Sequence, residues 1–239
     1  MDAAFPTDYQ PDRLLLFDVD GTLLRTHGGT TAAMTVAARD VFRDDFTYEG
    51  VDTLGGLDPL ILQAAITMNN VQADAEQIER FKQRYLEVAP DEVGLFRRMP
   101  GVPELLAALR HRKNYALGLL TGNYRESTMF KLKAVDLNPD WFAVGAFGED
   151  APTRPELLPV AAERAKSRFG RSFAPDRILI LGDTLRDVDC ALANGAHCLA
   201  VATGVVPIET LREGGAHVAL DNFADTEQTL GCIDRLLAD

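Results

Sequence analysis

The sequence has few cysteines and an excess of acidic over basic residues. Its three cysteines, Cys190, Cys198 and Cys232, include no C-x-x-C pair. We therefore expect reduced, mostly buried thiols rather than a disulfide, metal or redox site, as in cytoplasmic proteins. The 24 Lys and Arg residues against 36 Asp and Glu give a formal net charge of -12 at pH 7. Nucleic-acid phosphates and anionic membrane surfaces repel such a chain, so nucleic acid is not an expected partner.

Long hydrophobic runs are also missing. The N-terminal segment MDAAFPTDYQPDR has no basic start followed by an apolar stretch, and no segment approaches the roughly 20 apolar residues of a membrane span. We therefore expect a cytoplasmic protein with no membrane partner. With 46% hydrophobic residues among 239, the chain can bury a large core, either as one domain with an insertion or as two small domains.

Short apolar runs alternate with amphipathic segments along most of the chain. The apolar runs predict strands at 14–18, 116–120, 142–146, 178–181, 198–202 and, more weakly, 218–220. The amphipathic segments predict helices at 102–112, 125–135, 155–168 and 186–193. This alternation is typical of βα units, and it predicts an α/β fold with a doubly wound parallel sheet covered by helices on both faces.

One long segment interrupts the alternation. Between about residues 26 and 98 we find no convincing strand, and helical patterns occur at 30–42, 59–68 and 73–88. The sequence therefore predicts a smaller helical domain at 27–98, inserted into a core formed by 1–26 and 99–239. Glycines stand close to both ends of the insertion, which suits a pair of hinges.

Acidic and hydroxyl side chains follow three of the predicted strands. Ligands of an open parallel sheet gather outside the carboxyl ends of its strands, so we expect these side chains to share one site. Crowded carboxylates need a cation among them, and oxygen ligands without nearby His or Cys favour Mg²⁺. The alternative is that the aspartates are helix caps and turn residues, for Asp187 above all. The residues are Asp18 and Asp20, Thr121, Gly122 and Asn123, and Asp183 and Asp187.

The spacing of the first two aspartates suggests a chemistry. In an extended chain Asp18 and Asp20 point to the same side, because side chains alternate with a period of two. One carboxylate could attack phosphorus and form an aspartyl phosphate. The other could protonate the leaving oxygen and later deprotonate a water.

Three motifs resemble the haloacid dehalogenase-like hydrolase superfamily, in particular its phosphatases similar to phosphoglycolate phosphatase and β-phosphoglucomutase. They are Asp18-Val19-Asp20-Gly21-Thr22, Leu119-Leu120-Thr121-Gly122-Asn123, and Gly182-Asp183-Thr184-Leu185-Arg186-Asp187. The resemblance implies a Rossmann-like core with a mobile helical cap and a small phosphorylated metabolite as substrate.

The resemblance also implies roles for individual residues. Asp18 is the expected nucleophile and Asp20 the general acid and base, while Thr121 and the backbone N–H groups of Gly122 and Asn123 hold the phosphoryl oxygens. Mg²⁺ is expected on the Asp18 carboxylate, the backbone carbonyl of Asp20 and Asp183. Asp187 is expected either to coordinate the ion itself or to contact the residues that do.

The sequence departs from the family at a third motif, where a lysine usually precedes a helix. Here the segment reads Ala151-Pro152-Thr153-Arg154-Pro155-Glu156, and Arg154 stands in the matching place. Arginine keeps the positive charge and offers a fork suited to phosphate, so we expect Arg154 to bind the phosphoryl group and to act in catalysis. Lys131 and Lys133, on the helix after the second motif, are less favoured substitutes for the motif lysine, and we interpret them as solvated residues of a helix face. We interpret Asp58 as a helix cap. His27 is a hinge or surface residue, or a substrate contact.

Several activities remain to be weighed on this scaffold. Dehalogenases of the family lack the second aspartate, so Asp20 argues for phosphoryl transfer. Phosphonate hydrolysis requires a cap lysine, and Lys82, the only lysine there, lies in a charged helix. A phosphatase of small phosphate monoesters is the preferred hypothesis. A mutase similar to β-phosphoglucomutase and a non-catalytic binding protein remain as alternatives, and we expect either a monomer or a homodimer.

Overall fold

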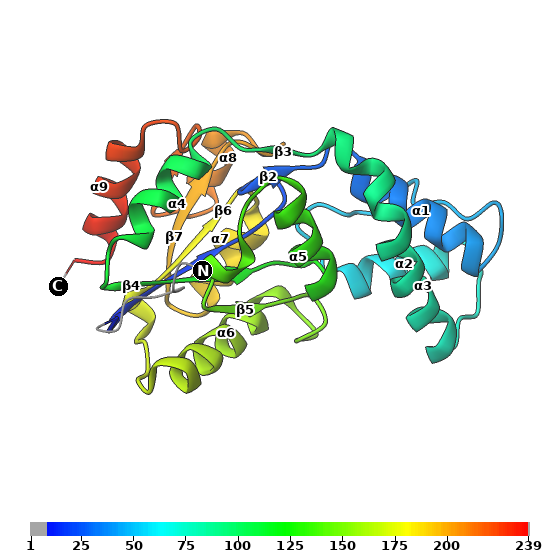
Figure 1. Cartoon of the computed structure of the whole chain (residues 1–239), viewed down its shortest axis with the longest axis horizontal. Coiled ribbons are helices and arrows are strands. Elements are labelled where there is room, and N and C mark those ends of the chain that lie inside the picture. Colours follow the sequence, from blue (N-terminus) through cyan, green and yellow to red (C-terminus); the bar gives the residue numbers. More distant parts are fainter. Residues whose placement is uncertain (1–8, 239) are drawn as a thin grey trace.

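A six-stranded parallel sheet lies at the centre of the larger part of the molecule (Figure 1). The computed structural model describes residues 9–238, so residues 1–8 and 239 of the predicted core lie outside it. The strands are β1 (Arg13–Phe17), β4 (Tyr115–Leu120), β5 (Val144–Ala146), β6 (Ile178–Gly182), β7 (His197–Val201) and β8 (Val218–Leu220). All six correspond to predicted strands, with small shifts at their ends.

The order of the strands is β5-β4-β1-β6-β7-β8. From β1 the chain runs outward through β4 to β5, returns to β6 on the other side of β1, and then runs outward to β8. This is the doubly wound arrangement that the sequence predicts. The winding changes direction beside β1, which is where such sheets bind their ligands.

Side chains of successive strand residues point alternately into two apolar clusters. Leu15 and Phe17 of β1 pack on one face of the sheet with helices α4 (Val102–Arg110), α5 (Arg125–Ala134) and α9 (Thr226–Leu236). Leu14 and Leu16 pack on the other face with α6 (Arg154–Phe169), α7 (Leu185–Ala193) and α8 (Ile208–Glu213). Apart from Arg13 and His197 at the starts of β1 and β7, the strands consist of apolar residues and glycine, because both faces of the sheet are covered. The three cysteines are buried and free, as expected.

A second, helical part lies at one end of the sheet (Figure 1). It comprises α1 (Gly29–Val41), α2 (Asp58–Met68), α3 (Ala75–Val88) and the 3₁₀ helix η1 (Ala89–Leu95). It has its own apolar cluster, in which the rings of Phe42, Phe46, Phe81 and Tyr85 form a chain of contacts. The helical part therefore packs around a third apolar cluster, to which the core contributes Tyr124 and Phe130.

We expected no strand between residues 26 and 98, but the last two residues of this range form one. Strand β3 (Arg97–Arg98) pairs in antiparallel fashion with β2 (Leu24–Arg25), so that both connections to the helical part run together. A ladder of two residues is too short to show periodicity in the sequence. Helices α8 and α9 were also not predicted. Helix α8 spans only six residues, and Gly231 lowers the helix propensity of α9.

The loop before α2 joins the two parts at the strand ends. The backbone N–H of Asp58 donates to the carbonyl oxygen of Gly122 over 2.7 Å. The Asp58 carboxylate accepts from the backbone N–H of Tyr124 over 2.8 Å. Our interpretation of Asp58 as a helix cap is therefore wrong: its buried carboxylate links the helical part to the loop after β4. Burial raises the pKa of this carboxyl to about 6, although Lys131 opposes the shift.

No helix among residues 9–238 is long and apolar enough to cross a membrane.

Candidate active site

The three central strands of the sheet end at polar residues. Asp18 directly follows β1, Thr121 follows β4 and Asp183 follows β6. Because β1 pairs with both β4 and β6 in register, these three residues reach the same edge. The backbone N–H of Asp18 still donates to the carbonyl oxygen of Leu181 over 2.9 Å, which fixes the chain where it leaves the sheet.

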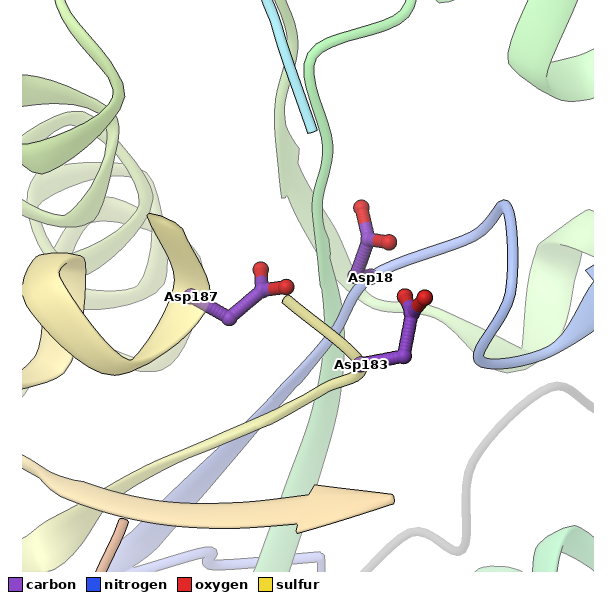
Figure 2. Close-up of side chains that lie close together, drawn as sticks. All are labelled: Asp18, Asp183 and Asp187. Carbon is purple, nitrogen blue, oxygen red and sulfur yellow. The ribbon is translucent and has the colours of Figure 1, made fainter. Parts of the chain in front are cut away.

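Three buried carboxylates converge at this edge. Oxygen atoms of Asp18, Asp183 and Asp187 all lie within 4.8 Å of one another. Figure 2 shows the carboxylates of Asp18 and Asp183 side by side at the strand ends, with Asp187 projecting toward them from α7. Burial raises the pKa of Asp18 to about 7; Arg154 opposes this shift and Asp187 adds to it. Burial, together with repulsion from Asp18 and Asp187, also raises the pKa of Asp183 well above its usual range.

The surroundings of Asp183 suit a bound cation. A Cβ atom at Gly21 would lie 2.2 Å from a carboxylate oxygen of Asp183, and one at Gly204 would lie 1.8 Å from the same oxygen. The two glycines therefore allow the backbone to close tightly around this carboxylate. The donor set consists of hard oxygen atoms, which favours Mg²⁺ or Ca²⁺ over softer metals. A cation at this point would stabilise the ionised carboxylates, whose pKa values are raised by burial and by mutual repulsion.

Arg154 is the cation that contacts two of the three carboxylates. It begins α6 and is 5% exposed. Its Nη2 donates to an oxygen of Asp18 over 2.9 Å and also to an oxygen of Asp187. Burial opposes the charge of the guanidinium, but the attraction of Asp187 and Asp18 outweighs it and raises the pKa of Arg154. Nη1 donates to the carbonyl oxygen of Gly55 over 3.1 Å, so Arg154 also contacts the loop before α2.

Asp187 has the contacts of a helix cap as well as a place in the acidic cluster. Its other oxygen accepts from the hydroxyl of Thr184 over 2.7 Å and from the backbone N–H of Thr184 over 3.1 Å, which completes a capping box for α7. Asp187 is therefore part of a helix cap, as the capping alternative expects. It also belongs to the group of carboxylates that could hold a cation, so its expected place at or near the metal stays a prediction.

Asp20 lies in a different environment. One carboxylate oxygen, Oδ2, accepts from Nζ of Lys131 over 2.7 Å and from the side-chain amide of Asn123 over 2.6 Å. The other oxygen, Oδ1, is buried and has no hydrogen-bond partner among the described residues. The carboxylate of Asp20 does not belong to the group formed by Asp18, Asp183 and Asp187. The expected contribution of its backbone carbonyl to a metal site stays a prediction.

Lys131 is a residue of the cavity that the sequence interpretation ranked below Arg154. We expected a solvated lysine, but its side chain is 1% exposed and also donates to Oδ1 of Asn123 over 2.7 Å. Burial opposes the ammonium charge, but Asp20, Tyr85 and Asp58 together outweigh it, and the pKa of Lys131 is raised. The helical spacing could have indicated this burial. Thr128 lies three residues before Lys131 and Leu132 one residue after it, and both belong to the buried face of α5. Lys133 is exposed, as expected.

A cavity of about 170 Å³ opens between the strand ends and the helical part. Its core side is lined by Asp18, Asp20, Thr121, Lys131 and Arg154 together with Gly122 and Asn123. The structure therefore brings the predicted catalytic and phosphate-binding residues to one small cavity. Asp183 and Asp187 lie behind it, and the exposed His27 is not among its lining residues.

Comparisons with known proteins agree with this geometry. A family model described as "Haloacid dehalogenase-like hydrolase" matches residues 15–201. A relative in Dickeya dadantii, named "Probable phosphatase IndB", is 29% identical over 219 residues, covering 89% of this chain and 90% of the relative. A "Phosphoglycolate phosphatase" of Nitrosospira multiformis is 26% identical over 198 residues, covering 81% of this chain and 85% of that relative. A solved hydrolase from Pseudomonas syringae shares the fold, with a TM-score of 0.71, 21% identity, and coverage of 92% of this chain and 99% of that one.

The contacts of Lys131 lead to a stability prediction. Lys131→Met keeps the length and the apolar stem of the side chain but leaves Asp20 and Asn123 without their donor. We expect the free energy of unfolding, measured with denaturant, to fall by about 1–3 kcal/mol. Lys133→Met, on the same helix, is the matched control and should change it by less than about 0.5 kcal/mol. Equal stabilities of the two variants would contradict the assignment of Lys131 as a buried anchor.

Proposed function

The chain belongs to the haloacid dehalogenase-like hydrolase family, and we propose that it is a Mg²⁺-dependent phosphatase of small organic phosphate monoesters. The expected branch of the family, with phosphoglycolate phosphatase and β-phosphoglucomutase, agrees with its relatives. We further propose that hydrolysis proceeds through an aspartyl-phosphate intermediate on Asp18.

One observation carries this proposal. Asp18 and Asp20 stand two residues apart on one cavity, yet their carboxylates have different partners. Asp18 contacts Arg154 and lies near Asp183, whereas Asp20 is held by Lys131 and Asn123. Two carboxylates in different environments can take two different roles in a single reaction.

The first step is nucleophilic attack. An oxygen of Asp18 forms a bond to phosphorus, and the bond between phosphorus and the alcohol oxygen breaks. Asp20 supplies the proton that the leaving oxygen takes up, and its unpartnered Oδ1 is the atom available for this transfer. In the second step Asp20 takes a proton from water, whose oxygen attacks phosphorus and releases inorganic phosphate from Asp18.

Donors around the cavity balance the charge of the transferring group. Arg154 adds a positive charge beside the attacking oxygen, as the usual lysine does in the family. The hydroxyl of Thr121 and the backbone N–H groups of Gly122 and Asn123 are the groups proposed to bind phosphoryl oxygens, which their position after β4 in the lining of the cavity supports. Asp18, Asp183 and the backbone carbonyl of Asp20 are the groups that would hold Mg²⁺. When bound, the ion supplies charge neutralisation for the phosphoryl oxygens.

We also propose that residues 27–98 act as a cap over this cavity. The loop from Asp52 to Asp58 contacts the core through Gly122, Tyr124 and Arg154, and these contacts seal one side of the site. Such a cap keeps bulk water away while the substrate alcohol is still bound.

The raised pKa of Asp18 predicts how Mg²⁺ binding depends on pH. A carboxyl with a pKa of about 7 keeps its proton below that pH, and the ion must displace this proton to bind. By calorimetry we expect the affinity for Mg²⁺ to fall as the pH is lowered through about 7, by up to roughly tenfold per pH unit for each proton displaced, and the raised pKa of Asp183 adds to this dependence. Asp183→Asn should abolish binding, whereas Asp189→Asn, an exposed position on α7, should not. An affinity independent of pH would contradict the assignment of Asp18 as a ligand.

The role of Asp18 is tested by its closest neutral analogue. In Asp18→Asn the shape is kept but the nucleophile is lost, so release of inorganic phosphate from acetyl phosphate and from an aryl phosphate should fall by at least about a thousandfold. EDTA should abolish the same activity in the wild-type protein, and added Mg²⁺ should restore it. Wild-type turnover in Asp18→Asn would refute the mechanism.

For Arg154 we expect a loss of transition-state binding. Arg154→Ala should lower kcat/KM by at least about thirtyfold, which corresponds to about 2 kcal/mol for a lost charged contact. Arg154→Lys restores the residue usual in the family and should recover part of the loss, which separates the effect of charge from a folding defect. Arg168→Ala, exposed near the end of the same helix, is the control. An unchanged rate in Arg154→Ala would assign the role to another cation.

A further inference from the structure

The side of the cavity formed by the helical part carries hydroxyl groups rather than basic side chains. Thr30, Thr31 and Thr53 line it together with the apolar Met34 and Ile61. The one charged side chain that the helical part contributes to this lining is the carboxylate of Asp58. This side faces the phosphate-binding residues across the cavity, so it is where the alcohol part of a phosphate ester must lie.

The two cations of the cavity are already engaged on the core side. Arg154 donates to Asp18 and Asp187, and Lys131 donates to Asp20 and Asn123. Both are at most 5% exposed and are tied to the groups that handle the phosphate. Nε of Arg154 has no hydrogen-bond partner among the described residues, but the charge of each cation is already matched by a carboxylate of the core, so neither offers an unpaired charge to a second anionic group of the substrate.

The basic residues of the helical part lie away from the cavity. Arg43 pairs with Asp45, Arg84 with Asp40 and Glu87, and Lys82 with Glu79. Arg39 donates to the carbonyl oxygen of Phe46. On the outer side of the loop before α2, Arg186 of the core pairs with Asp52 and lines a neighbouring hollow instead. A carboxylate on the substrate would therefore be desolvated beside Asp58 without a partner, which disfavours its binding.

One hydroxyl in the lining lacks a partner. Oγ1 of Thr30, in the first turn of α1, is buried and makes no hydrogen bond to any described residue. A buried polar atom without a partner is costly, and a ligand hydroxyl placed beside it would satisfy it. The cavity is also smaller, at about 170 Å³, than the roughly 300–1,000 Å³ of sites for drug-sized ligands.

We propose, resting on the phosphatase function above, that the substrate is the phosphate monoester of a small, uncharged alcohol that carries further hydroxyl groups, such as a polyol or a small sugar. The phosphate occupies the core side, and the hydroxyl groups of the alcohol bind the threonine side. Esters that carry a carboxylate near the phosphate are discriminated against.

Matched substrate pairs test this inference. Glycerol 3-phosphate and 3-phosphoglycerate differ in a terminal CH₂OH against a carboxylate, and 2-hydroxyethyl phosphate and phosphoglycolate differ in the same way. We expect kcat/KM with Mg²⁺ to be at least roughly tenfold higher for the hydroxyl member of each pair. Equal or higher values for the two acids would overturn the inference.

Two variants test the residues that carry it. Thr30→Val should lower the ratio of kcat/KM for glycerol 3-phosphate to that for propyl phosphate. The substitution removes a hydrogen bond to a substrate hydroxyl, and propyl phosphate has no hydroxyl on its alkyl chain to form that bond. Thr35→Val, on the same helix but outside the lining, should leave this ratio unchanged. Thr53→Lys adds a cation and should shift the preference toward 3-phosphoglycerate, whereas Thr53→Gln should not. An unchanged ratio in Thr30→Val would remove Thr30 from the recognition of substrate.

Acetyl phosphate separates the two levels of the proposal. Because its leaving group is reactive, its hydrolysis depends little on contacts with the helical part. Its Mg²⁺-dependent hydrolysis therefore tests the core residues alone. If acetyl phosphate is hydrolysed but neither hydroxyl ester is, the inference about the alcohol is wrong while the phosphatase function stands. If acetyl phosphate is not hydrolysed either, the proposed function itself fails.

Discussion

Repulsion among buried carboxylates is the constraint on which the rest of the site depends. Oxygen atoms of Asp18, Asp183 and Asp187 lie within 4.8 Å of one another, and all three residues are at most 5% exposed. Burial is the largest cause of the raised pKa values of Asp18 and Asp183, and repulsion between the carboxylates adds to it. Arg154 offsets part of it from the start of α6, and the remaining negative charge favours a bound cation beside Asp183.

A second cation gives the two aspartates of the first motif different partners. Lys131 reaches Asp20 from α5, and Arg154 reaches Asp18 from the opposite face of the sheet. Two neighbouring carboxylates are thereby held by different partners and can act differently on one phosphate. Both cations also lie close to the helical part: Arg154 donates to Gly55, and Lys131 attracts the buried carboxylate of Asp58. The charge balance of the site and the contact between the two parts are therefore linked.

Much of this arrangement was predictable because parallel sheets impose it. The apolar runs identified the strands, and the residues directly after them had to meet at one edge. What sequence could not supply is the contact between distant elements. The environment of Lys131 depends on how α5 packs against β1 and the helical part, and a lysine on a mixed helix face is more often solvated. Asp58 precedes a proline at the start of a helix, which suggests a cap, but its carboxylate bonds instead to Tyr124 in another part of the chain.

The most direct measurement of the central claim is calorimetric titration with beryllofluoride, a mimic of a phosphoryl group on a carboxylate. A site in which Asp18 accepts the phosphoryl group beside a bound cation predicts saturable binding that requires Mg²⁺ and disappears in Asp18→Asn. A protein that keeps only the fold would show no Mg²⁺-dependent binding. That result, or equal binding by Asp18→Asn, would contradict the account.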